Sequence, residues 1–303
     1  MSDDDEDIGI ADAMMMRGNR LRELRQLAEL DELERGNQSI DTIDPNEVPQ
    51  SQVVCFLDCC GETQSVLRYE SYLAHQRYYD DLKHYDMDYI DYSGVVIQQD
   101  KRLGKGGLCW DAAFILAEHL ISSSNNVEWS NLSIVELGTG TGLCGILLAH
   151  HLPCHVEITD LPSLLPLMQR NVELNFGTVN DLSDQDKQIL FDGTLNKKYQ
   201  SGSCEAKVLE WGTQSSAGKK YHIILGADIV ASLYDPIKLA DTIHQLSYEH
   251  SVVYISYKGR LDGPHYTFEQ RMSQLYTHVN YRKIPRSRNK NPGVFILKAT
   301  GAK

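Results

Sequence analysis

The sequence predicts an α/β fold: an open, largely parallel sheet with helices on both faces, preceded by an N-terminal extension. Short apolar runs typical of buried strands alternate with runs typical of amphipathic helices along the second half of the chain. A glycine-rich turn joins one such strand directly to a helix, as in nucleotide-binding α/β units. A chain of 303 residues, 42% of them hydrophobic and 23% charged, can bury one good core but hardly two full domains.

Residues 1–48 predict an acidic, largely disordered tail. The first fifty residues hold fourteen Asp and Glu against five Arg, so they carry −9 of the net charge of −13. This composition is typical of a solvated, unfolded segment. Leucines that recur every three residues predict an amphipathic helix within it, from about Asn19 to Arg35. The helix either docks on the core or holds a partner.

Residues 49–107 predict an N-terminal extension of the main domain. Strand-like runs at Val53 to Leu57 and Val95 to Gln98 enclose a tyrosine-rich stretch from Tyr69 to Tyr92. Its amphipathic rings either pack the extension or wall a substrate channel. A turn is expected from Lys101 to Gly107.

The main domain is predicted over residues 108–303. It opens with a helix from Leu108 to Leu120, which carries Trp110 on its apolar face. The periodicity then predicts strands at 134–137, 156–159, 206–209, 221–227 and 252–257, helices at 143–151 and about 162–175, and a final antiparallel pair at 282–285 and 294–298. The long polar connection from Phe176 to Glu205 is predicted to be disordered or an insert.

The glycine turn and the strand after it predict a nucleotide-type ligand. Gly138, Gly140 and Gly142 separate the strand end at Leu137 from the next helix, and the following strand ends in Asp160. Glycines let the backbone turn tightly and approach a ligand, while the carboxylate is placed to accept two ribose hydroxyls. We therefore expect a ligand with an adenosine-type ribose.

The spacing of the turn favours one such ligand. A dinucleotide fingerprint would place its third glycine at position 143, where this chain has Leu143. Glu136 adds a negative charge that would repel a diphosphate and tolerate a cation. S-adenosylmethionine, a sulfonium with a free amino group, fits these features.

Candidate ligand groups follow four of the predicted strands. Ligands of open α/β sheets bind beyond the carboxyl ends of the strands. At those ends the sequence places Glu136 to Gly142, Asp160, Glu210 to Gly212, and Ala227 with Asp228. We expect these groups to share one cleft.

Five motifs together resemble a known family. They are Trp110-Asp-Ala-Ala, Glu136-Leu-Gly-Thr-Gly-Thr-Gly-Leu, Thr159-Asp-Leu, Leu209-Glu-Trp-Gly and Leu225-Gly-Ala-Asp-Ile-Val. Over roughly Val95 to Ala299 the chain resembles the methyltransferase 16 family. The resemblance implies a seven-stranded, Rossmann-like class I methyltransferase sheet, S-adenosylmethionine as cofactor, and methyl transfer to a lysine side chain of a cytosolic protein.

The resemblance also implies which residues form the site. Cofactor contacts are expected from Trp110, Gly138, Thr139, Gly140, Asp160, Trp211 and Ala227, and the turn itself adds Glu136 and Gly142. On the acceptor side, Asp228 is expected to orient the amine. The family carries Tyr or Phe three residues after this acidic position, but this chain has Ala231 there, and Tyr234 is the candidate replacement.

The remaining expectations are negative. No run of about eighteen apolar residues and no secretory signal is visible, so we expect no membrane association and a location in the cytosol or nucleus. Seven cysteines without a Cys-x-x-Cys pair predict reduced thiols and no metal site. No basic stripe with interleaved aromatics points to nucleic acid. We expect a monomer with a protein substrate; methylation of a small molecule, or a binding module that keeps the cofactor fold without turnover, stay open.

Overall fold

The computed structural model describes residues 55–57, 95–124, 127–177, 201–213, 218–258, 265–284 and 294–303. The predicted tail helix, the tyrosine-rich stretch and most of the connection from Phe176 to Glu205 lie outside these residues. The boundaries proposed at residues 48 and 107 stay predictions.

The main sheet has seven strands in the order β5-β4-β3-β6-β7-β9-β8, which confirms the predicted fold class. The strands are β3 (Ser133–Leu137), β4 (His155–Asp160), β5 (Ser203–Val208), β6 (Ile223–Ala227), β7 (Val252–Lys258), β8 (Tyr276–Ile284) and β9 (Val294–Ala302). Strands β3 to β7 pair in parallel, whereas β9 is antiparallel to both β7 and β8. From β3 the chain builds outward to β4 and β5, and then returns to place β6 on the other side of β3. Ligands of α/β sheets bind at such a switch point.

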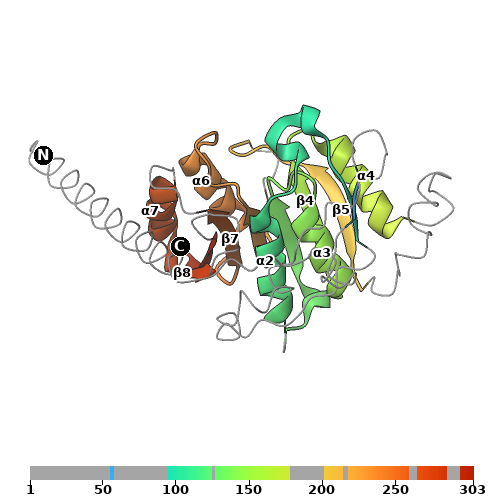
Figure 1. Ribbon diagram of the computed structural model, residues 1–303. Helices are drawn as coiled ribbons and strands as arrows, with labels where there is room; N and C mark the ends of the chain where they lie inside the picture. The colour runs from blue at the N-terminus through green and yellow to red at the C-terminus, as the bar shows by residue number, and fades with distance from the viewer. Residues whose placement is uncertain are drawn as a thin grey trace, which may run out of the picture.

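Helices cover both faces of this sheet (Figure 1). One face carries α2 (Asp111–Ser122), α3 (Leu143–His151) and α4 (Leu165–Phe176), and the other carries α6 (Pro236–Leu246) and α7 (His265–Leu275). Successive strand residues point to opposite faces. Ile134 accordingly packs against the first group of helices, and Val135 against the second. In the described part of the chain, no helix is long and apolar enough to cross a membrane.

The helix boundaries agree best with those predicted from the sequence next to the glycine turn. Helix α3 runs from Leu143 to His151 as predicted. Helix α2 begins at Asp111, so Trp110 precedes it with extended backbone (φ −126°, ψ 147°) and does not lie on the helix face where the sequence placed it. The predicted turn at Lys101–Gly107 is a 3-10 helix, η5, and Trp129–Asn131 form another, η6. Neither α6 nor α7 was predicted.

A separate parallel pair, β1 (Cys55–Leu57) and β2 (Val96–Gln98), precedes η5. Two buried asparagines of α4 bind β2 as a neighbouring strand would. The Asn175 side chain accepts from Val96 N–H (3.0 Å) and donates to Val96 O (2.7 Å). The Asn171 side chain accepts from Gln98 N–H (2.7 Å) and donates to Gln98 O (3.0 Å) and to Thr141 O (2.8 Å). These bonds tie the segment that leads into η5 to the helix and to the glycine turn.

The described cysteines agree with the predicted reduced state. Cys109, Cys144, Cys154 and Cys204 are free thiols. Burial raises the pKa of each of them, to about 12 for Cys109 and Cys154. They therefore stay protonated and pack as small apolar side chains.

Candidate active site

A cavity of about 580 Å³ lies at the carboxyl ends of β3, β4, β5 and β6, between η5, the start of α2 and the first turn of α6. Its volume falls within the roughly 300–1,000 Å³ common for small-molecule sites. Of the eleven residues that the sequence nominates, nine line it: Trp110, Gly138, Thr139, Gly140, Asp160, Trp211, Ala227, Asp228 and Tyr234. The fold therefore brings the strand-end groups together as expected.

The glycine turn forms the floor between β3 and α3. Gly138, Gly140 and Gly142 have φ values of 58°, 59° and 85°, in the left-handed region that glycine adopts without strain. A side chain at Gly140 would meet the carbonyl oxygen of Gly106, from η5, at 2.6 Å. The backbone N–H of Gly140 also donates to Asp160 Oδ2 at 2.8 Å. The turn therefore packs closely against η5 and is hydrogen-bonded to the end of β4.

Two hydrogen bonds orient the Asp160 carboxylate, and its oxygens can accept further hydrogen bonds. Its Oδ2 accepts from Gly140 N–H, and its Oδ1 accepts from Leu161 N–H at 2.7 Å. Because a carboxylate oxygen has two lone pairs, each oxygen can accept another donor. Burial raises the pKa of Asp160, and the two backbone bonds oppose that rise. The N-cap of α4 is Leu164, so Asp160 does not cap that helix.

Two indoles stand in the cavity wall. Trp110 is partly buried, and its Nε1–H donates to Lys105 O at 2.9 Å, which holds it against η5. Trp211 follows β5 and is placed by α6, because Gly212 N–H donates to Thr242 Oγ1 at 2.9 Å. Neither indole is a fully buried core residue. An indole offers a surface to a planar or cationic ligand, although Lys258 Nζ already lies over the Trp110 ring, 6.0 Å from its centroid.

The charge of the wall favours a cation. Among the residues that the structure describes, four carboxylates line the cavity against two lysines: Asp160, Glu210, Asp228 and Asp235 against Lys105 and Lys238. A net negative wall repels a diphosphate and attracts a sulfonium or an amine. Together with the acceptor at Asp160 and the indoles, this set of groups fits S-adenosylmethionine.

Comparison with known proteins gives the family. The family described as lysine methyltransferase matches residues 90–184 and 178–275, more than half of the chain. The chain belongs to this lysine methyltransferase family.

Similar proteins carry names of the same kind. The methyltransferase is 31% identical to "EEF1A lysine methyltransferase 3" of Mus musculus over 179 residues, 59% of this chain and 66% of that protein. It is 31% identical to "Protein N-lysine methyltransferase METTL21A" of Xenopus tropicalis over 172 residues, 56% of this chain and 69% of that protein. The match to "EEF1A lysine methyltransferase 3" of Xenopus tropicalis is 29% over 201 residues, 65% of this chain and 76% of that protein.

Asp228 of the methyltransferase has an unusual backbone conformation. It follows β6 with φ 55°, and it is the non-glycine residue with positive φ among those that the structure describes. Its N–H donates to Ser256 O at 2.8 Å, which anchors it to β7. Aspartate tolerates this conformation better than most residues, and such strain clusters at functional sites. Asp235, not Asp228, caps α6, since its side chain accepts from Ile237 and Lys238 N–H.

Tyr234 reaches the cavity next to Trp211. The two rings form an edge-to-face pair, with centroids 5.5 Å apart and planes at 72°. Ala231, at the family's aromatic position, is buried. Burial and the charges of Asp160 and Asp228 raise the pKa of Tyr234, so its phenol keeps its proton at neutral pH. Tyr234, three residues after Ala231, therefore places an aromatic ring in the cavity wall, and its role as the replacement stays a prediction.

Glu136 and Gly142 do not line the cavity, in contrast to the prediction. The Glu136 side chain is buried and accepts from Gly145 N–H at 2.8 Å, so it supports the start of α3. Burial raises its pKa to about 7, against the opposing effect of the hydrogen bond from Gly145 N–H. A side chain at Gly142 would meet Ile158 at 2.8 Å, so this glycine serves close packing of helix and strand.

Sequence reasoning missed the wall that η5 contributes. Lys105, Gly106, Leu108 and Cys109 all line the cavity. Three glycines in four positions, Gly104 to Gly107 with Lys105 between them, were the available signal, but this segment was interpreted as a simple turn. Leu161 and Lys238 were also missed: Leu161 ends the Thr159-Asp-Leu motif but was not expected to contact a ligand, and Lys238 lies outside all five motifs.

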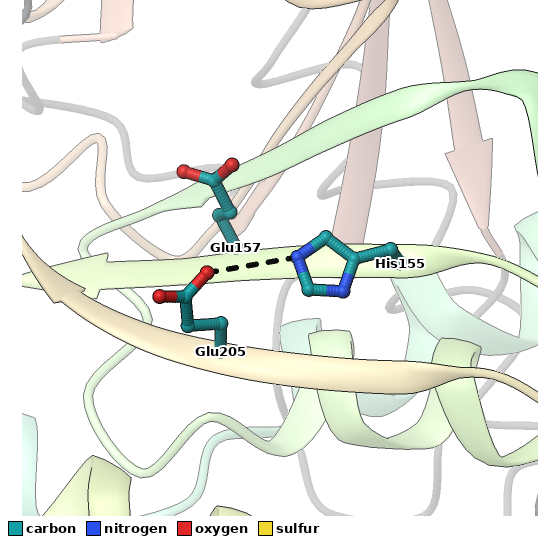
Figure 2. A group of neighbouring side chains, drawn as sticks. All are labelled: His155, Glu157 and Glu205. Carbon is teal, nitrogen blue, oxygen red and sulfur yellow. Dashed lines mark ion pairs between the residues drawn. The ribbon is translucent and has the colours of Figure 1, made fainter.

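A second cluster of candidate ligand groups lies elsewhere on the sheet. His155 and Glu157 of β4 and Glu205 of β5 place ligand atoms within 4.8 Å of one another, and Figure 2 shows the imidazole facing the Glu205 carboxylate. Lys207 pairs with Glu157 at 3.1 Å and with Glu205 at 2.8 Å, and Lys219 also pairs with Glu157. Burial would raise the pKa of Glu157, but these partners outweigh it and lower the pKa. A metal ion would have to displace two ammonium groups, so the cluster is an ion-pair network.

Proposed function

We propose that the protein transfers a methyl group from S-adenosylmethionine to a lysine side chain of another protein. The observation that carries this proposal is the single cavity in which Asp160, the two indoles and Asp228 meet, in a chain of the lysine methyltransferase family. The names of its relatives support a protein acceptor. The cytosol or nucleus stays the predicted compartment.

The chain's residues divide into two groups. Asp160, Trp110 and the backbone at Gly138 to Gly140 would hold the nucleoside, and the acidic wall favours the sulfonium. When bound, S-adenosylmethionine supplies a methyl group made electrophilic by the positive sulfur. The acceptor side then needs only a neutral, aligned amine.

Asp228, Trp211 and Tyr234 suit that task. A free lysine has a pKa near 10.4, so the amine must lose its proton before it can attack. The Asp228 carboxylate can accept a hydrogen bond from the amine and fix its direction, while the aromatic pair limits its motion. Because its pKa is raised, the Tyr234 phenol can donate a hydrogen bond but cannot act as a base at neutral pH.

The test is methyl transfer to lysine. The protein is incubated with methyl-labelled S-adenosylmethionine and a cell lysate, and labelled proteins are hydrolysed to amino acids. We expect label in methylated lysine. Label in another residue, or in small molecules alone, would contradict the lysine assignment.

A variant pair assigns the role of Asp228. Asp228→Asn should keep cofactor affinity and lose transfer at least about tenfold, ~1.4 kcal/mol. The matched control Asp241→Asn removes a partly exposed carboxylate on α6 that pairs with Arg271 at 2.8 Å and does not line the cavity, and it should leave transfer unchanged. Equal rates in both variants would remove Asp228 from the acceptor site.

A further inference from the structure

Exposed apolar side chains gather at the mouth of the cavity. Seven large hydrophobic residues in the described part of the chain are exposed, and four lie here: Leu161 (49%), Leu233 (62%), Tyr234 (37%) and Ile237 (47%). We call these four the apolar rim. The first three line the cavity, and Ile237 lies between Asp235 and Lys238, which line it too. Scattered exposed leucines need no explanation, but a cluster beside a functional cavity marks an interaction surface.

The apolar rim is held by ordered elements. Leu161 follows β4 directly, with its N–H bonded to Asp160. Ile237 lies in the first turn of α6, where its N–H donates to the capping carboxylate of Asp235 at 2.9 Å. Tyr234 N–H donates to Ala231 O at 3.0 Å. A surface that is already in place pays less ordering entropy when a partner binds.

Negative charge lies beside this apolar surface. Glu210, Asp228 and Asp235 line the same mouth, with Lys238 as the adjacent cation. The combination matches a partner whose positive group enters the cavity while apolar side chains rest on its edge. A small molecule contained within the cavity would gain nothing from the exposed edge.

We propose that the apolar rim is the docking surface for the acceptor protein, and that it takes a segment whose target lysine is flanked by apolar side chains. This rests on the proposed function, because it assumes that the acceptor is a protein lysine. The ammonium group is drawn toward Asp228 and Glu210. The flanking side chains cover Leu233 and Ile237, and so select the lysine by its neighbours.

The test measures peptide binding rather than turnover. Two short fluorescent peptides each carry one lysine, flanked on both sides by leucine in one and by serine in the other. They are titrated with the full chain saturated with S-adenosylhomocysteine, and binding is followed by anisotropy. We expect the leucine peptide to bind at least about tenfold more tightly, ~1.4 kcal/mol.

Two variants test whether the preference for the leucine peptide depends on the apolar rim. The double change Leu233→Ser with Ile237→Ser should abolish it while leaving cofactor affinity unchanged. Val127→Ser is the matched control, since Val127 is 42% exposed and does not line the cavity; it should keep the preference. Equal binding of the two peptides, or a preference that survives in the double variant, overturns the proposal. A change in sedimentation mass of the double variant also overturns it, because a second copy of the chain would then cover the rim.

Failure of docking and failure of the proposed function give different results. Methyl transfer to both peptides is measured in parallel. Methyl transfer to both peptides without a leucine preference would contradict the docking proposal and support the proposed lysine methyltransferase activity. A leucine preference in binding, with no transfer to either peptide and no methylated lysine in the labelled lysate, keeps the apolar rim as a peptide-binding surface and contradicts the proposed function.

Discussion

Replacing Gly140 with alanine should destabilise the protein and distort the cavity beside the glycine turn. The residue has φ 59°, and an added Cβ would lie 2.6 Å from the carbonyl oxygen of Gly106. The left-handed conformation costs alanine about 1–2 kcal/mol. Relief of the clash requires backbone movement, which costs about 1–3 kcal/mol more. The expected loss is therefore about 2–5 kcal/mol, less a few tenths recovered from a stiffer unfolded chain.

Gly104→Ala separates the two contributions. Gly104 lies in η5 with φ 69°, yet a Cβ there meets nothing within 4 Å. Its ψ of −142° lies in a region that essentially only glycine adopts, so the variant should show the conformational cost alone, about 1–3 kcal/mol. Urea denaturation measures both variants. Calorimetry should show S-adenosylmethionine binding weakened at least about tenfold in Gly140→Ala and much less in Gly104→Ala. Equal losses in stability and affinity would refute the claim that the turn and η5 are in contact.

Two other predictions follow from buried polar groups. The pKa of Glu136 is raised from 4.5 to about 7 in the folded state, so the folded protein binds a proton that the unfolded chain has lost, and stability falls as pH rises between these values. The free energy of unfolding of Glu136→Gln, measured by urea denaturation, should therefore exceed that of the wild type by about 1–3 kcal/mol at pH 8 and by little at pH 5. A difference that does not change with pH would contradict this prediction. Asn175→Ala leaves the N–H and carbonyl of Val96 without their partners and should cost about 2–4 kcal/mol. Hydrogen exchange at Val96 should accelerate in that variant, and unchanged protection would show that β2 does not depend on the asparagine.

The sheet and the strand-end residues that line the cavity were predictable because they depend on local patterns. The apolar runs place the strands, and the strand-turn-helix at Gly138 to Gly142 sets the boundary of α3 to the residue. The carboxyl ends of parallel strands converge, so residues far apart in sequence were correctly expected to meet. Helix α6 was missed although Asp235 and Pro236 give a standard start signal, an N-cap followed by proline at the first turn.

The predictions that were wrong or missing concern side-chain orientation and contacts between distant segments, neither of which can be read from a local sequence pattern. The Glu136 side chain lies on the side of the strand that faces α3. Its carboxylate accepts a hydrogen bond from Gly145 N–H there and does not reach the cavity. Trp110 was assigned to a helix face by periodicity, yet its bond to Lys105 O holds it outside the helix. The segment that leads into η5 is bonded to Asn171 and Asn175 on a helix more than seventy residues away in sequence, a contact that no local pattern reveals. The apolar rim combines one residue after β4 with three after β6, and no single stretch of sequence reveals it.

Calorimetric titration of the cofactor tests the central claim most directly. S-adenosylmethionine and NAD are each titrated into the wild-type chain and into Asp160→Asn, which keeps an acceptor oxygen but loses the charge. We predict that S-adenosylmethionine binds the wild type with one site, that NAD does not bind, and that the variant binds at least about tenfold more weakly, ~1.4 kcal/mol. Preferential binding of NAD, or S-adenosylmethionine affinity unchanged in Asp160→Asn, would contradict the assignment of this cavity.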